Sequence, residues 1–216
     1  KRLLAYSSIS HSGYMLVGVI AGTAEGIDAV LFYLVTYGVA NVAMFGVLCG
    51  LQRHGREVET LDDLSGLWKR HPGMAFVLAA SSFSMLGLPP LLGFWGKLDL
   101  VVAGITAGET PLVVIMMAAS AVSSYYYLHL AGLPVIRKPD ARTEGVDAGP
   151  TPWPKVAAVV FGVGILTLPF AAKSLMTQAE QSTDHSWIAP PEAAAADAAT
   201  PDPAIAFEAE TSNGRV

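Results

Sequence analysis

The stretch SMLGLPPLLGFWGKLD, residues 84–99, interrupts a long apolar run and places a lysine inside it. That run covers residues 71–106, and as one continuous helix it would be roughly 54 Å long, whereas the hydrocarbon core of a bilayer is only about 30 Å thick. Pro89 and Pro90 remove two backbone donors, and Gly87 and Gly93 add backbone freedom at the same point. The pattern predicts either two short spans joined by a hairpin or one span broken in its middle.

The composition indicates an integral membrane protein. The chain has 216 residues, of which 52% are hydrophobic and 14% charged, whereas a soluble domain carries about 25% charged residues. Its single cysteine excludes a disulfide within the chain and a cysteine-held iron–sulfur cluster. We expect an all-α bundle of about five transmembrane helices that binds no cofactor and no metal.

Five apolar segments are long enough to be these helices. A tail with seven acids and one base follows them, and we expect it to be disordered because it lacks hydrophobic periodicity. The chain begins with Lys1 and has no signal peptide, so we interpret it as the C-terminal part of a longer membrane protein. The predicted helices cover residues 3–22, 27–51, 71–106 with its break, 111–136 and 153–175, and the tail covers residues 176–216.

The distribution of basic residues decides between the hairpin and the broken span. If the Pro-Pro segment crosses the membrane once, ten of the thirteen bases lie on the side where the chain begins. A hairpin would split the bases evenly between the two sides. The positive-inside rule therefore favours one broken span, with the loops at residues 52–70 and 137–152 cytoplasmic and the acidic tail outside. Within the first loop, LDDLSGLW at residues 61–68 is typical of a short amphipathic piece on the membrane surface.

Lys97 would lie near the middle of the bilayer, about one turn into the second half-helix. An ionisable residue at that depth is costly and indicates an ion or proton path. Burial and the positive end of the half-helix disfavour its ammonium form, while carbonyls freed at the break favour it. A lysine balanced in this way can exchange a proton. The alternative is a lysine whose side chain reaches back to the membrane surface.

The first predicted helix is unusually polar for a membrane span. At helical spacing, Ser7, His11 and Tyr14 share one face, with Ser8 on a neighbouring one, and such a face should point into the bundle. A proton path through His11 and a structural histidine bonded to a neighbouring hydroxyl are equal alternatives. Further path candidates are Ser84, Ser124, Tyr126 and Asp99.

Two stretches, KRLLAYSSISHSGYM at residues 1–15 and GLPPLLGFWGK at residues 87–97, resemble the antiporter-like proton-channel subunits of respiratory complex I and their relatives in Mrp antiporters and membrane-bound hydrogenases. The resemblance covers residues 1–175. The lysine at position 97, YSSISH and SSYYYL at residues 123–128 are most similar to the subunit N branch of that family. Leu98 and Asp99 depart from its pattern.

The resemblance implies a proton-translocating membrane-arm subunit of a bacterial NADH–quinone oxidoreductase in the inner membrane. It implies the second half of an inverted-repeat fold, in which Lys97 is the terminal proton-carrying site and Lys1 and His11 belong to the same path. NADH, FMN, iron–sulfur clusters and quinone would be bound elsewhere in the complex, and other membrane-arm subunits, including another antiporter-like one, would be the partners.

Two other functions stay open at this point. One is a cation/proton antiporter subunit of the Mrp type or a subunit of a membrane-bound hydrogenase. The other is a structural membrane subunit whose path is no longer used, against which the presence of Lys97 argues.

Overall fold

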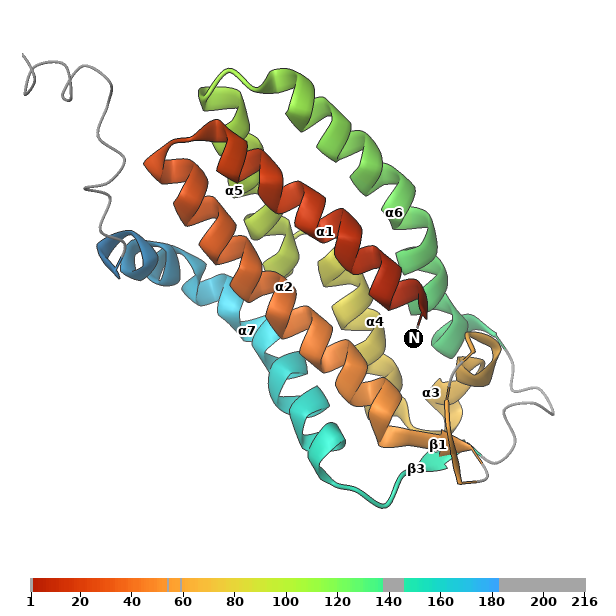
Figure 1. Ribbon diagram of the computed structural model, residues 1–216. Coiled ribbons are helices and arrows are strands. Elements are labelled where there is room, and N and C mark those ends of the chain that lie inside the picture. The colour runs from red at the N-terminus through yellow and green to blue at the C-terminus, as the bar shows by residue number, and fades with distance from the viewer. Residues whose placement is uncertain (1, 54, 59, 138–145, 183–216) are drawn as a thin grey trace, which may run out of the picture. The chain divides into compact units, whose positions relative to one another are not determined.

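The computed structural model describes residues 2–53, 55–58, 60–137 and 146–182, and most of them are helical (Figure 1). Four of the described helices are long and apolar enough to cross a membrane. The long helices are α1 (Arg2–Ala21), α2 (Ala24–Gly50), α6 (Thr110–Ile136) and α7 (Trp153–Ser182), and two shorter ones are α4 (Pro72–Leu86) and α5 (Leu92–Thr106).

The helices α4 and α5 are the two halves of the broken span. Gly87 ends α4 in the left-handed region, with φ of +88°, and its backbone N–H and that of Leu88 both donate to the carbonyl of Phe83. Pro89 and Pro90 form the turn, after which Leu92 begins α5. The predicted helical membrane bundle with a break at Pro89-Pro90 is confirmed.

The helix α2 packs against α1, α4, α5 and α7, and Figure 1 shows it running beside α7. The two helices approach closely at Gly46, where an added Cβ would lie 2.8 Å from the Pro154 carbonyl oxygen and 2.9 Å from the Ala158 nitrogen. Glycine is needed here because the two backbones leave no space for a side chain. The core beside this contact contains Met44, Val47, Leu78, Tyr127 and Ile165, all almost fully buried.

The two segments expected to be cytoplasmic loops pair with each other at one end of the helices. Strand β1 (Leu51–Arg53) lies between β2 (Arg56–Glu57) and β3 (Val146–Ala148) in a small antiparallel sheet. The first segment continues into a 3₁₀ turn (Asp62–Leu64) and the short helix α3 (Leu67–Arg70). Strands of two or three residues carry too little periodicity to be predicted.

Two ion pairs hold the 3₁₀ turn, one from β1 and one from the residue after α6. Arg53 pairs with Asp63 at 3.1 Å, and Arg137, directly after α6, pairs with Asp62 at 2.9 Å. We define the cap as the described residues between Leu51 and Arg70 together with Arg137 and β3.

The last helix extends further than predicted. The expected end was residue 175, but α7 continues to Ser182. Met, Gln, Ala and Glu follow residue 175, and all of them favour helix, whereas hydropathy marks only the part that suits a membrane. The rest of the predicted disordered tail, residues 183–216, lies outside the described residues.

Candidate functional site

Lys97 is buried where the two half-helices meet α6. Only 8% of its surface is exposed. Its Nζ donates to the Ser120 Oγ on α6 at 2.8 Å and to the Leu86 carbonyl oxygen at 3.2 Å. That carbonyl belongs to the last turn of α4, where the break leaves carbonyls without a helical partner. The break thus supplies one acceptor for the lysine, and α6 supplies the other.

The surroundings of the Lys97 stem fix its direction. Its Cδ lies 3.2 Å from the position that a Cβ would take at Gly87, so a side chain at residue 87 would displace the lysine. On another side, Nζ lies 5.4 Å from the centre of the Tyr14 ring, within the range of a cation–π contact. Gly87 and Tyr14 therefore direct the ammonium group toward α6.

Ser84 links the two half-helices across the break. Its buried Oγ accepts a hydrogen bond of 3.0 Å from the Gly93 N–H. Gly93 is in the first turn of α5, where backbone donors have no partner within the helix. Ser84 thus caps α5 from the neighbouring half-helix. An added Cβ at Gly93 would overlap the Ser84 carbonyl, so this contact also requires glycine.

His11 is held from both sides by tyrosines of other helices. The Tyr33 hydroxyl on α2 lies 2.5 Å from Nδ1, and the Tyr127 hydroxyl on α6 lies 2.9 Å from Nε2. All three side chains are at most 2% exposed. The Tyr37 ring stacks on the imidazole with a centroid distance of 4.9 Å. Both ring nitrogens therefore have partners.

A polar seam runs along the contact between α1 and α6, which lie side by side in Figure 1. His11 bonds Tyr127, and one turn further along α1 the Tyr14 hydroxyl lies 3.1 Å from the Ser123 Oγ. The next inward residue of α6 is Ser120, the partner of Lys97. We define the polar seam by these six residues: His11, Tyr14, Lys97, Ser120, Ser123 and Tyr127.

A small cavity brings His11 and Lys97 together. The two side chains line it with Tyr33, Thr36, Ser84 and Gly93, and it has room for about one water molecule. A water molecule in this cavity would be surrounded by the His11 imidazole, the Lys97 ammonium group and the hydroxyls that line it. The arrangement can pass protons between hydrogen-bonded groups.

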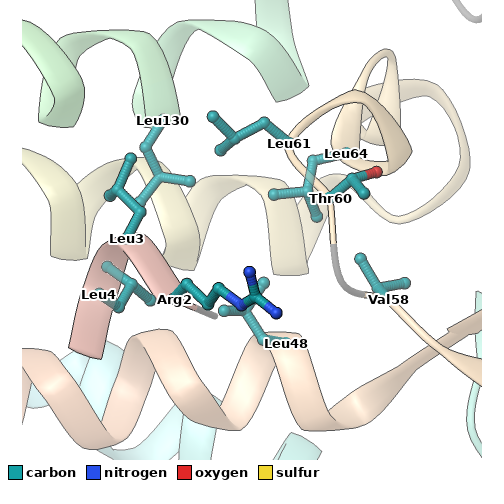
Figure 2. Close-up of a pocket in the computed structure, with 9 residues that line it drawn as sticks. All are labelled: Arg2, Leu3, Leu4, Leu48, Val58, Thr60, Leu61, Leu64 and Leu130. Atoms are coloured by element: carbon teal, nitrogen blue, oxygen red, sulfur yellow. The ribbon is translucent and has the colours of Figure 1, made fainter. Parts of the chain in front are cut away.

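A second, wider pocket of about 460 Å³ lies where α1 begins. Figure 2 shows the Arg2 guanidinium extending into it among leucines of α1, α2, α6 and the cap. Leu4 and Leu130 line this pocket and are themselves almost fully buried. Leu4 is one turn before Ser7 on α1, and Leu130 is one turn after Tyr127 on α6. An apolar layer therefore separates the wide pocket from the polar seam.

Three predicted path residues donate to carbonyls of their own helix. Ser7 and Ser8 donate to the carbonyls of Leu4 and Ala5, at 2.8 and 2.6 Å. Ser124 donates to the Ser120 carbonyl at 3.0 Å, on the flank of the polar seam. Their role in proton transfer stays a prediction. Lys1 lies outside the described residues.

Two further candidates have buried polar atoms without partners. The Tyr126 hydroxyl and the Asp99 Oδ2 make no hydrogen bond within the described part of the chain. No ion pair joins Asp99 to Lys97 among those residues, in agreement with their spacing of two along α5, which turns them to different faces. Neither is part of the polar seam.

Sequence reasoning did not identify the partners of the two central residues. Tyr33 and Tyr127 lie 22 and 116 residues from His11, and Ser120 lies 23 residues from Lys97. Tyr127 was noticed in the sequence as a member of the tyrosine run at residues 125–127. That run does not show which of the three rings points inward. In the described part of the chain, no group of three His, Cys, Asp or Glu residues could hold a metal ion.

Comparison with known proteins identifies relatives of this chain. The family model described as "NADH:quinone oxidoreductase/Mrp antiporter, TM" matches residues 1–123. NADH-quinone oxidoreductase subunit N of Paramagnetospirillum magneticum is 51% identical over 130 residues, which are 60% of this chain and 27% of that protein. Subunit N of Rhodospirillum rubrum is 41% identical over 182 residues, 84% of this chain and 37% of that protein. This chain thus spans between about a quarter and two fifths of these two relatives.

Solved structures share the fold. Respiratory complex I from Thermus thermophilus with bound aureothin contains a chain that is 36% identical, with a TM-score of 0.69 over 82% of this chain and 39% of that one. The Mrp complex from Dietzia sp. DQ12-45-1b has a chain with a TM-score of 0.68 over 82% of this chain and 41% of that one, and at 23% identity it shows the fold alone. The chain belongs to the transmembrane family of NADH:quinone oxidoreductases and Mrp antiporters.

Proposed function

We propose that this chain works as part of a membrane-arm subunit of a proton-translocating NADH–quinone oxidoreductase. The relatives named subunit N support the kind of complex, and the buried Lys97 in the break of a membrane helix is the observation that carries the proton function. NADH oxidation and quinone reduction would take place in other subunits. Other membrane-arm subunits would be its partners, and FMN, iron–sulfur clusters and quinone would bind outside this chain.

In this proposal Lys97 accepts and releases a proton inside the membrane. Ser120 and the Leu86 carbonyl stabilise its ammonium form, and the Tyr14 ring adds to this. When a neighbouring charge or the hydration of the small cavity changes, the balance shifts and the proton leaves toward the next acceptor. The path from Lys97 leads toward His11, because both side chains line the same small cavity.

The proposed sidedness rests on the basic residues. The cap carries Arg53, Lys69, Arg70 and Arg137, and by the positive-inside rule these residues support a cytoplasmic position for it. The wide pocket beside Arg2 would then open toward the cytoplasm. The acidic tail would lie on the outer side of the inner membrane.

The test is proton pumping by the complete complex reconstituted in vesicles, with Lys97→Met in this subunit. We expect proton translocation per electron to fall several-fold in a fully assembled complex. Lys69→Met is the matched control, because Lys69 is exposed in the cap and loses the same charge. Normal pumping by an assembled Lys97→Met complex would overturn the proposal.

A further inference from the structure

His11 is bonded at both ring nitrogens to hydroxyls that come from two other helices. Tyr33 lies on α2 at 2.5 Å from Nδ1, and Tyr127 lies on α6 at 2.9 Å from Nε2. A neutral imidazole has one nitrogen that donates and one that accepts. A hydroxyl can do either. The three side chains therefore form a continuous hydrogen-bonded chain with a direction, set by which nitrogen carries the proton.

The two ends of this chain have different surroundings. Tyr33 borders the small cavity that Lys97 also lines. Tyr127 belongs to the hydrophobic cluster that contains Leu4 and Leu130, the two leucines at the wide pocket. A proton that crosses from one tyrosine to the other thus moves between the Leu4–Leu130 layer and the cavity of Lys97.

We propose that Tyr33 and Tyr127 are proton-relay residues, which pass protons through His11 to and from Lys97. This inference rests on the proposed function. In one direction, a water molecule that passes the Leu4–Leu130 layer gives a proton to the Tyr127 oxygen as the hydroxyl proton of Tyr127 moves to Nε2. The proton on Nδ1 moves to the Tyr33 oxygen, and the original Tyr33 hydroxyl proton passes into the small cavity. One proton enters, one leaves, and no net charge is left on the three side chains.

Each passage reverses the direction of the chain. Afterwards Nε2 holds the proton and donates to Tyr127, while Nδ1 accepts from Tyr33. A second proton can follow in the same direction only after the imidazole has turned over and the hydroxyls have rotated. The arrangement therefore passes single protons and requires a resetting step between them. In a row of water molecules the reset is the rotation of small, mobile molecules, whereas here a buried imidazole must turn over.

Both hydroxyls are needed in this scheme, but packing around the imidazole is not. The Tyr37 ring at 4.9 Å and the Tyr14 ring at 5.2 Å also enclose His11. Phenylalanine at residue 33 or residue 127 keeps the ring and removes only the oxygen. Because the relay is a series of steps, losing either hydroxyl interrupts it, and losing the second adds nothing.

The experiment uses the complete complex in vesicles, with Tyr33→Phe, Tyr127→Phe and the double variant. The matched control is Tyr125→Phe, since Tyr125 is on the same helix as Tyr127 but 79% exposed. Protons translocated per electron, quinone reduction rate, assembly and thermal stability are measured for each. We expect each single variant to lose most of its proton translocation, and the double variant to lose no more than either single one.

The outcomes separate the relay from the proposed function. Normal translocation by assembled Tyr33→Phe or Tyr127→Phe complexes would overturn the relay. So would losses that add in the double variant and follow a fall in thermal stability, because that is the behaviour of packing residues. Lys97→Met is measured in parallel: if it abolishes translocation while the tyrosine variants pump normally, only the relay fails. If Lys97→Met pumps normally, the proposed function itself fails.

Discussion

The Ser84 side chain accepts a hydrogen bond of 3.0 Å from the Gly93 N–H, nine residues further along the chain and on the opposite side of the helix break. One hydroxyl therefore fixes the two half-helices relative to each other. The bond also gives a partner to a buried donor at the start of α5. The break is thus a defined joint with its own contacts.

Replacing Ser84 with alanine should weaken this joint. The Gly93 N–H would be left buried without a partner, at a cost of about 1–3 kcal/mol in the free energy of unfolding. Ser82→Ala is the control: Ser82 is equally buried, but its hydroxyl donates to the Leu78 carbonyl of its own helix and leaves no orphaned donor. Thermal unfolding of the purified complex measures the difference, and equal stability of the two variants would contradict the role of Ser84.

Replacing Gly87 with alanine should disturb Lys97. The residue has φ of +88°, where an L side chain costs about 1–2 kcal/mol, and the new methyl group would meet the Lys97 stem. Gly108→Ala is a close control because Gly108 has φ of +82° and open space around it. Both variants should lose similar stability, but only Gly87→Ala should lose proton translocation as well. Similar translocation in the two would show that the contact with Lys97 is unimportant.

Replacing Ser120 with alanine removes the shorter of the two hydrogen bonds of the Lys97 ammonium group. A hydrogen bond to a charged group contributes about 1.5–3 kcal/mol, so the protonated lysine becomes less stable and translocation should slow. Thr167→Val is a suitable control, since Thr167 donates to a carbonyl of α7 at an exposed position. The initial rate of proton uptake into vesicles is the measurement. An unchanged rate would mean that Ser120 is dispensable.

Replacing Gly46 with alanine should loosen the contact between α2 and α7. The added methyl group would lie 2.8 Å from the Pro154 carbonyl oxygen, and such overpacking costs about 1–3 kcal/mol. Gly38→Ala, in the same helix but with nothing within 4 Å of the new Cβ, should keep or raise the stability. Thermal unfolding in detergent separates the two, and a stable Gly46→Ala variant would contradict the close approach.

The fold could be predicted from the sequence because two physical signals agreed: the length of the apolar run, and the positions of the prolines, glycines and basic residues. Residues 71–106 were too long and too apolar for one span, and the prolines, glycines and basic residues indicated where and how the span breaks. The apolar segments predicted the helix bounds to within a few residues. The exception is the end of α7, which continues past residue 175 as a polar helix to Ser182. The small sheet was missed because its strands are too short to show a pattern.

The candidate site was only partly accessible from the sequence. Helical spacing placed His11 and Tyr14 on one face, and the apolar surroundings marked Lys97. Tyr33, Ser120 and Tyr127 come from other helices, and the rotation of one helix against another is set by packing that no single helix encodes.

The size of the small cavity bears on which ions can cross. A sodium or potassium ion that leaves water needs several oxygen atoms around it in place of its hydration shell. The space between His11 and Lys97 admits about one water molecule, and in the described residues the polar seam beside it consists of bonded side-chain pairs. If this chain passes protons as proposed, an alkali metal ion would find too few oxygen atoms in that space to replace its hydration shell. The small volume would then favour protons over the sodium and potassium ions of a living cell.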